Sequence, residues 1–298
     1  MEKEDLSQAF EQHPELNSVI KKLTEKFDPI KIICFSKMES KVRSKGFFKD
    51  FKEVSISHYH LLMITEDSAR IEHAVQDFVN FHFTDGTITI LVHGIGIVQE
   101  LTGKHHPFFC SVLGKGQLLY SKDGLFVASS IPQSDPKKTY EKALEHYNCR
   151  YSTAKAFHSS AKNALEEENY NIALFLMHQA VEQACIAMIS VHLFYKSNIH
   201  NIDRLLKLTL CFSDKPSLVF RRNTKEDLRL FGILQSCYSM ARYEDNYKVE
   251  INDAYKLILL VDDFLKVGEG LCNEHLKKLK AGFTLPIETI PILEMSVT

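Results

Sequence analysis

The segment from Ala173 to Ile189 constrains this chain most, because nearly every residue in it is apolar. Its apolar residues fall on all sides of a helix instead of on one stripe, as the consecutive Leu174, Phe175 and Leu176 illustrate. A helix of this kind lies at the centre of its domain, where an unpartnered polar side chain costs a few kcal/mol. The sequence therefore predicts a central core helix and directs attention to the polar residues on it.

Those polar residues form the patch HQAVEQ at 178–183. His178 and Glu182 are four residues apart and share one helix face, while Gln179 and Gln183 share the neighbouring face. Two interpretations stay open. The pair is either a buried hydrogen-bonded contact that fixes helix packing or a polar wall of a functional cleft.

The overall composition is that of a globular protein with room for one large domain or two ordinary ones, since the chain has 298 residues. The net charge of −2 lacks the basic footprint of a dedicated duplex-DNA binder. By inspection, no run of apolar residues reaches the length of a membrane span, and the start MEKEDLSQAF is more polar than a signal peptide. Seven scattered cysteines without a CxxC pair indicate buried thiols in a reducing compartment. We therefore expect a cytoplasmic protein without a membrane contact.

The first part of the chain alternates between helical and strand patterns, which predicts a small α/β sheet domain over residues 1–130. Apolar residues on one side predict a helix over 8–27, and a second helix is expected over 68–81 with Ser68 as its cap. The expected strands are 30–36, 58–65, 87–93 and 117–121.

A loop-like segment at 123–138 separates this part from a series of helices. Thr224 and Asp227 form a capping box at the start of one of them. We therefore predict an α+β two-domain protein, with an all-α, up-down helical bundle over 138–282 and an extended tail over 283–298, where two prolines prevent a continuous helix. The expected helices are 139–168, 170–194, 202–212, 223–243 and a fifth with an apolar stripe from Ala254 to Leu279.

The helical part resembles the HEPN domains, helical bundles that occur in prokaryotic proteins beside nucleotidyltransferase-like domains. The resemblance rests on HQAVEQ, on NIHNIDRLLKL at 198–208, on NTKEDLRLFGILQSCYSMARY at 223–243 and on the EDNYKVEINDAYKLILLVDDFL that follows. It implies a homodimer formed through the bundle, in which the polar motifs of both subunits face a shared cleft.

The sheet part resembles the nucleotidyltransferase-like domains, but it departs from their motifs. The turn CFSKMES at 34–40 lacks the glycine of the family, and His58 and His60 stand where the family has the acids of DxD. Magnesium prefers oxygen ligands, so these positions predict a degenerate domain without transferase activity. The two imidazoles share a strand face and suit zinc better, but no third ligand is evident, so no metal site is predicted.

The second polar patch, ARYEDNY at 241–247, is where the resemblance implies a ribonuclease motif, an Arg followed four to six residues later by a His. Arg242 is present, but Tyr247 occupies a position where the His would stand. Such catalysis needs a base near neutral pH and a cation for the phosphate, and tyrosine is a poor base. Arg242 and Tyr247 are the candidate catalytic residues, although Arg242 could equally form a structural salt bridge or bind a phosphate.

The sequence thus predicts a nucleotide- or RNA-binding HEPN-type protein that is catalytically weak or inactive, with the stress or defence role that the resemblance implies. A metal-independent ribonuclease, a divergent nucleotidyltransferase and a structural assembly module are the alternatives, and a separate partner protein is left open. No cofactor is expected. The predicted ligand-binding residues are His178, Glu182, His200, Arg242, Tyr243 and Tyr247.

Overall fold

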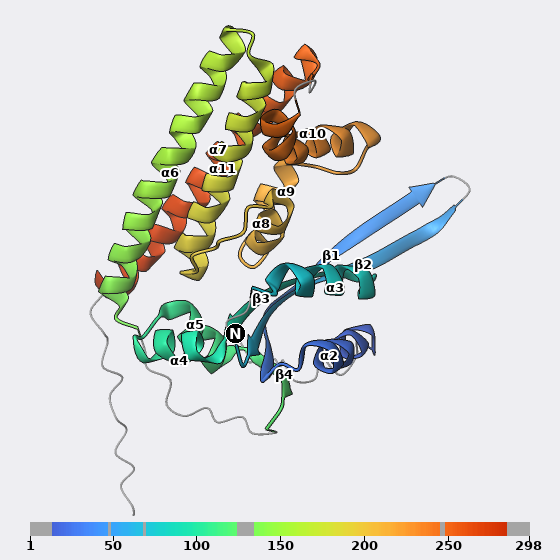
Figure 1. Ribbon diagram of the computed structural model, residues 1–298. Coiled ribbons are helices and arrows are strands. Elements are labelled where there is room, and N and C mark those ends of the chain that lie inside the picture. The colour runs from blue at the N-terminus through green and yellow to red at the C-terminus, as the bar shows by residue number, and fades with distance from the viewer. Residues whose placement is uncertain (1–13, 47–48, 68–69, 124–133, 245–247, 285–298) are drawn as a thin grey trace, which may run out of the picture.

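The computed structural model describes residues 14–46, 49–67, 70–123, 134–244 and 248–284. A four-stranded mixed sheet with flanking helices lies below a helical bundle (Figure 1). This arrangement confirms the predicted α+β fold class, a small sheet domain followed by a helix-rich region.

The sheet has the strand order β3-β2-β1-β4, with β1 and β2 forming a long antiparallel hairpin. β3 runs parallel to β2, and β4 runs antiparallel to β1. The sequence predicted all four strands but ended the first one too early and began the second one too late. The strands are β1 (Lys31–Gly46), β2 (Lys49–Thr65), β3 (Gly86–Gly94) and β4 (Gln117–Ser121).

Alternation along the strands gives the sheet two apolar faces, each covered by different helices. Leu61 and Met63 pack in one cluster with residues of α2 (Pro14–Phe27) and α3 (Glu72–His82). Leu62 and Ile64 pack in another cluster with residues of α4 (Ile95–Gly103) and α5 (Pro107–Lys115).

The helix boundaries in this part correct two expectations. α3 begins later than expected, at Glu72 with Ile71 in its N-cap position, and the predicted cap Ser68 lies outside the described residues. The sequence also missed α4 and α5, which have only nine residues each and therefore show too few turns for a helical period to emerge.

The bundle is built around α7, which contacts α6, α8, α10 and α11. Residues from Ala173 to Val191 are buried over most of its length, which confirms the predicted core helix. The predicted capping box is also present, since the Thr224 hydroxyl and the Asp227 carboxylate each accept a backbone N–H bond of 3.0 Å. The helices are α6 (Pro136–Glu166), α7 (Tyr170–Leu193), α8 (Ile202–Thr209), α9 (Lys215–Val219), α10 (Lys225–Tyr243) and α11 (Ile251–Thr284).

Contrary to the sequence expectation, α7 is long and apolar enough to cross a membrane when judged by length and composition alone. However, 78% of its most apolar window is buried inside the protein. This burial is that of a core helix, because its apolar surface already packs against the neighbouring helices.

One hydrophobic cluster runs from the sheet into the bundle, and buried polar contacts reinforce the junction. His60, only 1% exposed, donates from Nε2 to the backbone oxygen of Lys207 in α8 over 2.8 Å. Arg204 in the same helix donates from Nη2 to the backbone oxygen of Ile90 over 2.6 Å. The sheet and α8 are therefore held together by specific hydrogen bonds as well as by apolar contact.

The outer edge of β3 is covered by side chains. The Gln76 amide from α3 donates to the oxygen of Ile88 and accepts from the N–H of Ile90, over 2.7 and 3.1 Å. Because Arg204 binds the oxygen of Ile90, three polar backbone groups of this edge strand are satisfied without a further strand.

The two candidate metal ligands have other partners. His58 lies with its Nδ1 2.8 Å from the Thr87 hydroxyl, while His60 bonds to α8. Among the described residues, no group of three or more His, Cys, Asp or Glu side chains is placed to hold a metal ion.

We expect His60 to make stability depend on pH. Burial lowers its pKa to about 4, below the value of about 6.5 for an unfolded chain. The unfolded state then binds more protons between these values, so the free energy of unfolding falls as the pH drops from about 6.5 to about 4. His60→Gln keeps an amide donor for Lys207 but does not titrate, so it should flatten this fall by on the order of 2 kcal/mol in urea melts at several pH values.

His192 provides the comparison, because burial also lowers its pKa to about 4 at a site inside the bundle. His60→Gln and His192→Gln should each remove part of the pH dependence of stability, and the variant that carries both substitutions should remove more. A His60→Gln profile that superimposes on that of the wild type would refute the assignment.

Candidate functional site

A cleft of about 680 Å³ lies where the sheet domain meets the bundle. We call it the junction cleft. Its walls come from the start of α3, the end of β3, α4, α6, α7 and the segment after α7. The lining residues are Arg70, Glu72, His73, Val92, His93, Gly94, Ile97, Arg150, Glu182, Gln183, Ile186, Tyr195, Lys196, Ser197, Asn198 and His200.

The position of the junction cleft in the fold favours ligand binding. It opens at the carboxyl end of β3, which is parallel to β2, and open α/β sheets bind ligands at this end of their strands. α4 begins at Ile95, directly after Gly94 of the cleft, so its first N–H groups are at this edge.

The segment after α7 forms one wall because the helix ends abruptly. Phe194 takes the left-handed conformation with φ 56°, which costs a non-glycine residue about 1 kcal/mol. Tyr195 then shares a hydrogen bond of 2.9 Å with His93 of β3. The segment ends at Asn201, whose side chain accepts the N–H of Arg204 over 3.0 Å and caps α8. These anchors bring His200 beside α7.

Glu182 is the central polar group of the α7 wall. Its side chain is only 4% exposed, and its Oε1 accepts a hydrogen bond of 3.1 Å from Nδ1 of His200. Its Oε2 is buried with no hydrogen-bond partner among the described residues. Gln183 is beside it and accepts a bond of 3.0 Å from Arg150 of α6.

His178 lies deeper in the core than Glu182 does. The closest atoms of the two side chains, Nδ1 and Oε2, are 3.9 Å apart, which is too long for a hydrogen bond. The His178 ring lies 5.0 Å from the ring of Tyr238 in α10, centroid to centroid. The patch is thus divided, with Glu182 and Gln183 at the cleft and His178 against α10.

The charges around the junction cleft are mainly positive. Arg70, Arg150 and Lys196 line it, and of its two acids Glu72 pairs with Arg204 over 2.9 Å. Burial raises the pKa of Glu182, although the hydrogen bond from His200 opposes the rise. The cleft therefore offers cationic side chains and amide donors to an anionic ligand.

Arg204 supports this site from behind. Its side chain is 8% exposed, and its Nη2 reaches both Glu72 and the oxygen of Ile90. Its Nε and Nη1 are buried without a hydrogen-bond partner among the described residues. Sequence reasoning did not select Arg150, Lys196 or Arg204, because single cations carry no spacing signal and the chain brings them together only on folding.

The remaining predicted residues cannot be placed at this site. Arg242 and Tyr243 belong to the last turn of α10, but their side chains are not among those described. Tyr247 lies outside the described residues. Their roles stay predictions.

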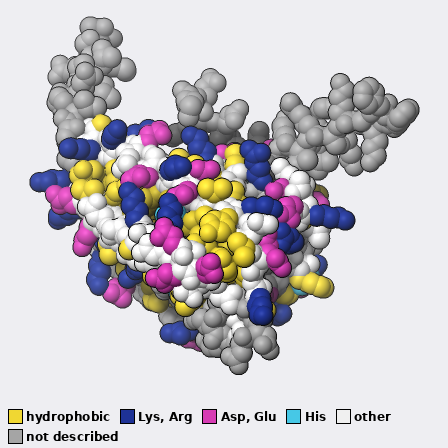
Figure 2. Space-filling view, turned by 90° about the horizontal axis from the view of Figure 1, so that it is seen from above, with side chains coloured by type: hydrophobic (Ala, Val, Ile, Leu, Met, Phe, Trp, Pro, Cys, Tyr) yellow, Lys and Arg dark blue, Asp and Glu magenta, His cyan; other side chains and the backbone are white. Residues whose placement is uncertain are grey.

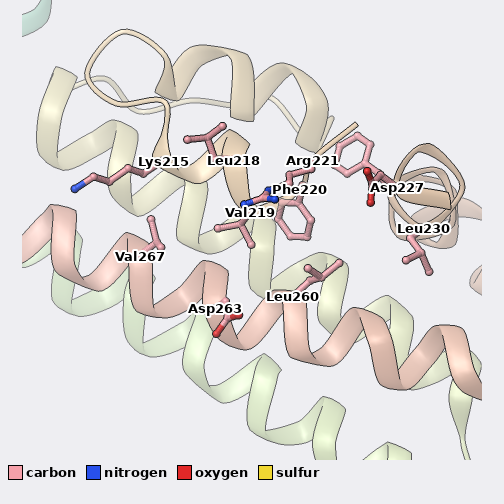
Figure 3. Close-up of a pocket in the computed structure, with 11 residues that line it drawn as sticks. Lys215, Leu218, Val219, Phe220, Arg221, Asp227, Leu230, Leu260, Asp263 and Val267 are labelled. Carbon is pink, nitrogen blue, oxygen red and sulfur yellow. The ribbon is translucent and has the colours of Figure 1, made fainter. Parts of the chain in front are cut away.

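A second concavity of about 560 Å³ lies between α9, α10 and α11, where Figure 3 shows Val219 and Leu260 among charged side chains. Apolar residues form much of it, and Lys215, Asp227 and Asp263 carry opposite charges around them. It lacks a buried polar group comparable to Glu182, so the junction cleft is the stronger candidate for a specific ligand.

Comparison with known protein families finds a match over much of the helical bundle. The family model for the HEPN domain matches residues 147–271. The chain contains a HEPN domain. The matched range includes Arg150, Glu182 and the segment Tyr195–His200, so this domain supplies one side of the junction cleft.

Among solved structures, the chain is similar to a nucleotidyltransferase-like protein from Exiguobacterium sibiricum 255-15. The identity is 8%, the match covers 90% of this chain and 80% of that one, and the TM-score is 0.30. No conclusion about the sheet domain rests on a similarity at this level. No curated protein matches the sequence.

The burial of Glu182 predicts a stability cost at neutral pH. Because its pKa is raised in the folded state, the wild type loses stability as the pH rises from the unfolded pKa of about 4.3 through the folded value. Glu182→Gln removes this charge with little change in shape. We expect the Tm of this variant at neutral pH to be as high as that of the wild type or a few degrees higher. The difference should shrink toward acid pH, where Glu182 of the wild type becomes protonated.

Glu100→Gln is the matched control, because Glu100 is exposed and pairs with the equally exposed Lys104. Its Tm should change little at any pH. A Glu182→Gln variant that melts well below the wild type throughout the pH range would show that the carboxylate stabilises the fold.

Proposed function

We propose that the junction cleft binds the phosphate-bearing part of a nucleotide. The observation that carries the proposal is the grouping of Arg70, Arg150 and Lys196 around a buried carboxylate in a cavity of about 680 Å³. Cavities of several hundred Å³ suit ligands of this size, and Arg side chains bind phosphate oxygens in bidentate fashion. The HEPN domain on one side of the cleft fits a ligand related to nucleotides or RNA.

The polar groups on α7 and after it suit the other parts of a nucleotide. The Oε2 of Glu182 can accept a hydrogen bond from a ribose hydroxyl or a base N–H, and satisfying it would offset its desolvation. Ser197 and Asn198, in the segment after α7, offer further donors and acceptors.

The proposed role is binding, without magnesium-dependent nucleotidyl transfer. His58 and His60 stand at the positions where the resemblance implies carboxylates, and they contact Thr87 and Lys207 instead. Imidazoles are poor ligands for magnesium. A role in stress or defence signalling, as the HEPN resemblance implies, is part of the same proposal.

Isothermal titration with nucleoside mono-, di- and triphosphates, without magnesium, tests the proposal. The double variant Arg150→Ala with Lys196→Ala should weaken nucleotide binding by about tenfold or more, since two phosphate contacts are lost. Lys162→Ala is the control, because Lys162 is on the same helix as Arg150 but pairs with Asp262 on the surface. The control should bind like the wild type.

Two results would overturn the assignment to the junction cleft. One is a wild-type protein that binds no nucleotide, and the other is a double variant with unchanged affinity. Arg242→Ala separates the predicted motif from the cleft. If this variant alone abolishes binding, the ligand occupies the region of the motif instead.

A homodimer through the bundle is the proposed assembly. Support comes from Ile251, Tyr255 and Leu259 of α11, which repeat every four residues and are 52%, 49% and 63% exposed. Figure 2 shows hydrophobic side chains gathered in the middle of the upper face, with charged ones around them. An exposed apolar stripe of this kind is typical of a surface that contacts another protein.

We expect Leu259→Asp to convert a dimer into a monomer, because the contact would have to bury an unpaired charge. Light scattering coupled to size-exclusion chromatography measures the mass. Leu218→Asp is the matched control, since Leu218 is 56% exposed on α9 and outside the stripe. A wild type that is monomeric at high concentration would rule out the dimer.

A further inference from the structure

His200 and Glu182 form an imidazole–carboxylate pair in the junction cleft. The Nδ1 of His200 donates to the Oε1 of Glu182 over 3.1 Å. The side chain of His200 is 67% exposed, while that of Glu182 is only 4% exposed. Because Nδ1 carries the proton in this bond, Nε2 holds the lone pair that can accept another proton. A buried carboxylate that orients an exposed imidazole in this way is suited to general base catalysis.

The segment after α7 holds His200 in place. Burial alternates along this segment. Its buried residues are Tyr195, Ser197 and Ile199, and its exposed residues are Lys196, Asn198 and His200. The N–H of Ile199 donates to the Ser197 hydroxyl over 3.2 Å, and Asn201 caps α8 directly after His200. The imidazole therefore has an anchored residue on each side, in addition to its bond to Glu182.

Two cations that line the same cleft complete the arrangement. Arg150 donates from Nη1 to Gln183 over 3.0 Å, which fixes its guanidinium beside the residue that follows Glu182. A guanidinium has five N–H donors, so this bond leaves others for an anion. Lys196 belongs to the same segment as His200 and is exposed. A phosphate in the cleft would thus meet cations and a proton acceptor together, and cations stabilise the charge that develops on phosphoryl oxygens.

This combination favours a strained phosphodiester as the substrate. The geometry defines a proton acceptor, and a five-membered cyclic ester is the phosphodiester that depends least on a matching proton donor, because opening its ring relieves strain. A cavity of about 680 Å³ also has the size for a single nucleotide. A nucleoside 2′,3′-cyclic phosphate meets both conditions.

We infer that the junction cleft hydrolyses nucleoside 2′,3′-cyclic phosphates, with His200 as the general base. Nε2 of His200 takes a proton from a water molecule, the water oxygen forms a bond to phosphorus, and one ring P–O bond breaks. The released ribose oxygen takes a proton from solvent, and the exposed His200 returns its own proton to solvent. One water is consumed, and the product is a nucleoside 2′- or 3′-monophosphate.

This inference rests on the proposed binding of nucleotides in the cleft and adds a reaction to it. Glu182 is a positioning residue in the reaction, because it acts through His200. Its negative charge favours the protonated imidazole that forms when water is deprotonated.

Chromatography of the products formed from the four 2′,3′-cyclic nucleoside monophosphates, with EDTA present, tests the inference on the full chain. His200→Gln should lower kcat by about a hundredfold or more, as expected when a general base is lost. Its affinity for nucleoside 3′-monophosphates, measured by isothermal titration, should stay close to that of the wild type. His158→Gln is the matched control, since His158 also lies 3.1 Å from a carboxylate, that of Asp262, but does not line the cleft. It should hydrolyse the substrates like the wild type.

Glu182→Gln separates positioning from folding. The amide can still accept the hydrogen bond from Nδ1, but it lacks the charge that favours the protonated imidazole. We expect kcat to fall by about tenfold or more, although the Tm of this variant should be no lower than that of the wild type. A variant that is as stable as the wild type and less active supports a role in the reaction, and one with the kcat of the wild type overturns that role.

Failure of this inference can be told apart from failure of the binding proposal. A wild type that binds nucleoside monophosphates but does not open the cyclic ones overturns the hydrolysis alone, and a wild type that does neither overturns both. A His200→Gln variant that keeps its kcat, or that loses affinity instead of kcat, overturns the role of His200. Hydrolysis of 3′,5′-cyclic nucleotides alone, or cleavage of an RNA strand without turnover of the cyclic mononucleotides, overturns the assigned substrate.

Discussion

The burial of α7 on all sides is the constraint on which the rest of the structure depends. The helix has no solvent-facing stripe along most of its length, so α6, α8, α10 and α11 must surround it. Glu182 and Gln183 lie where the surrounding layer is incomplete, and Arg150 and His200 reach them from neighbouring elements. The fold therefore determines the position of the junction cleft.

The junction between sheet and bundle gives the cleft its second wall. Leu62 and Leu91 of the sheet belong to the same hydrophobic cluster as α7, and α8 is bonded to the sheet through His60 and Arg204. A ligand in the cleft would contact residues that are far apart in the sequence but fixed relative to one another by this shared core. Binding there would stabilise the junction itself, since it favours the folded state of both walls.

The sequence was informative wherever a local pattern dictated the structure. The apolar run predicted α7, and the capping box at Thr224 placed the start of α10 within a residue. The length of the hairpin was missed because the sequence of residues 40–52 shows no sustained alternation of apolar and polar residues. The grouping of Arg150, Lys196 and Glu182 was missed for a different reason, since only tertiary contacts bring these residues together.

The side chains that cover β3 have a consequence for the behaviour of the protein in a crowded solution. An uncovered edge strand can recruit a strand from another molecule and start a growing assembly. Gln76 and Arg204 occupy the polar groups of Ile88 and Ile90 that such a strand would need. Arg204 comes from the helical bundle. The bundle therefore helps to prevent strands of other molecules from pairing with the edge of β3.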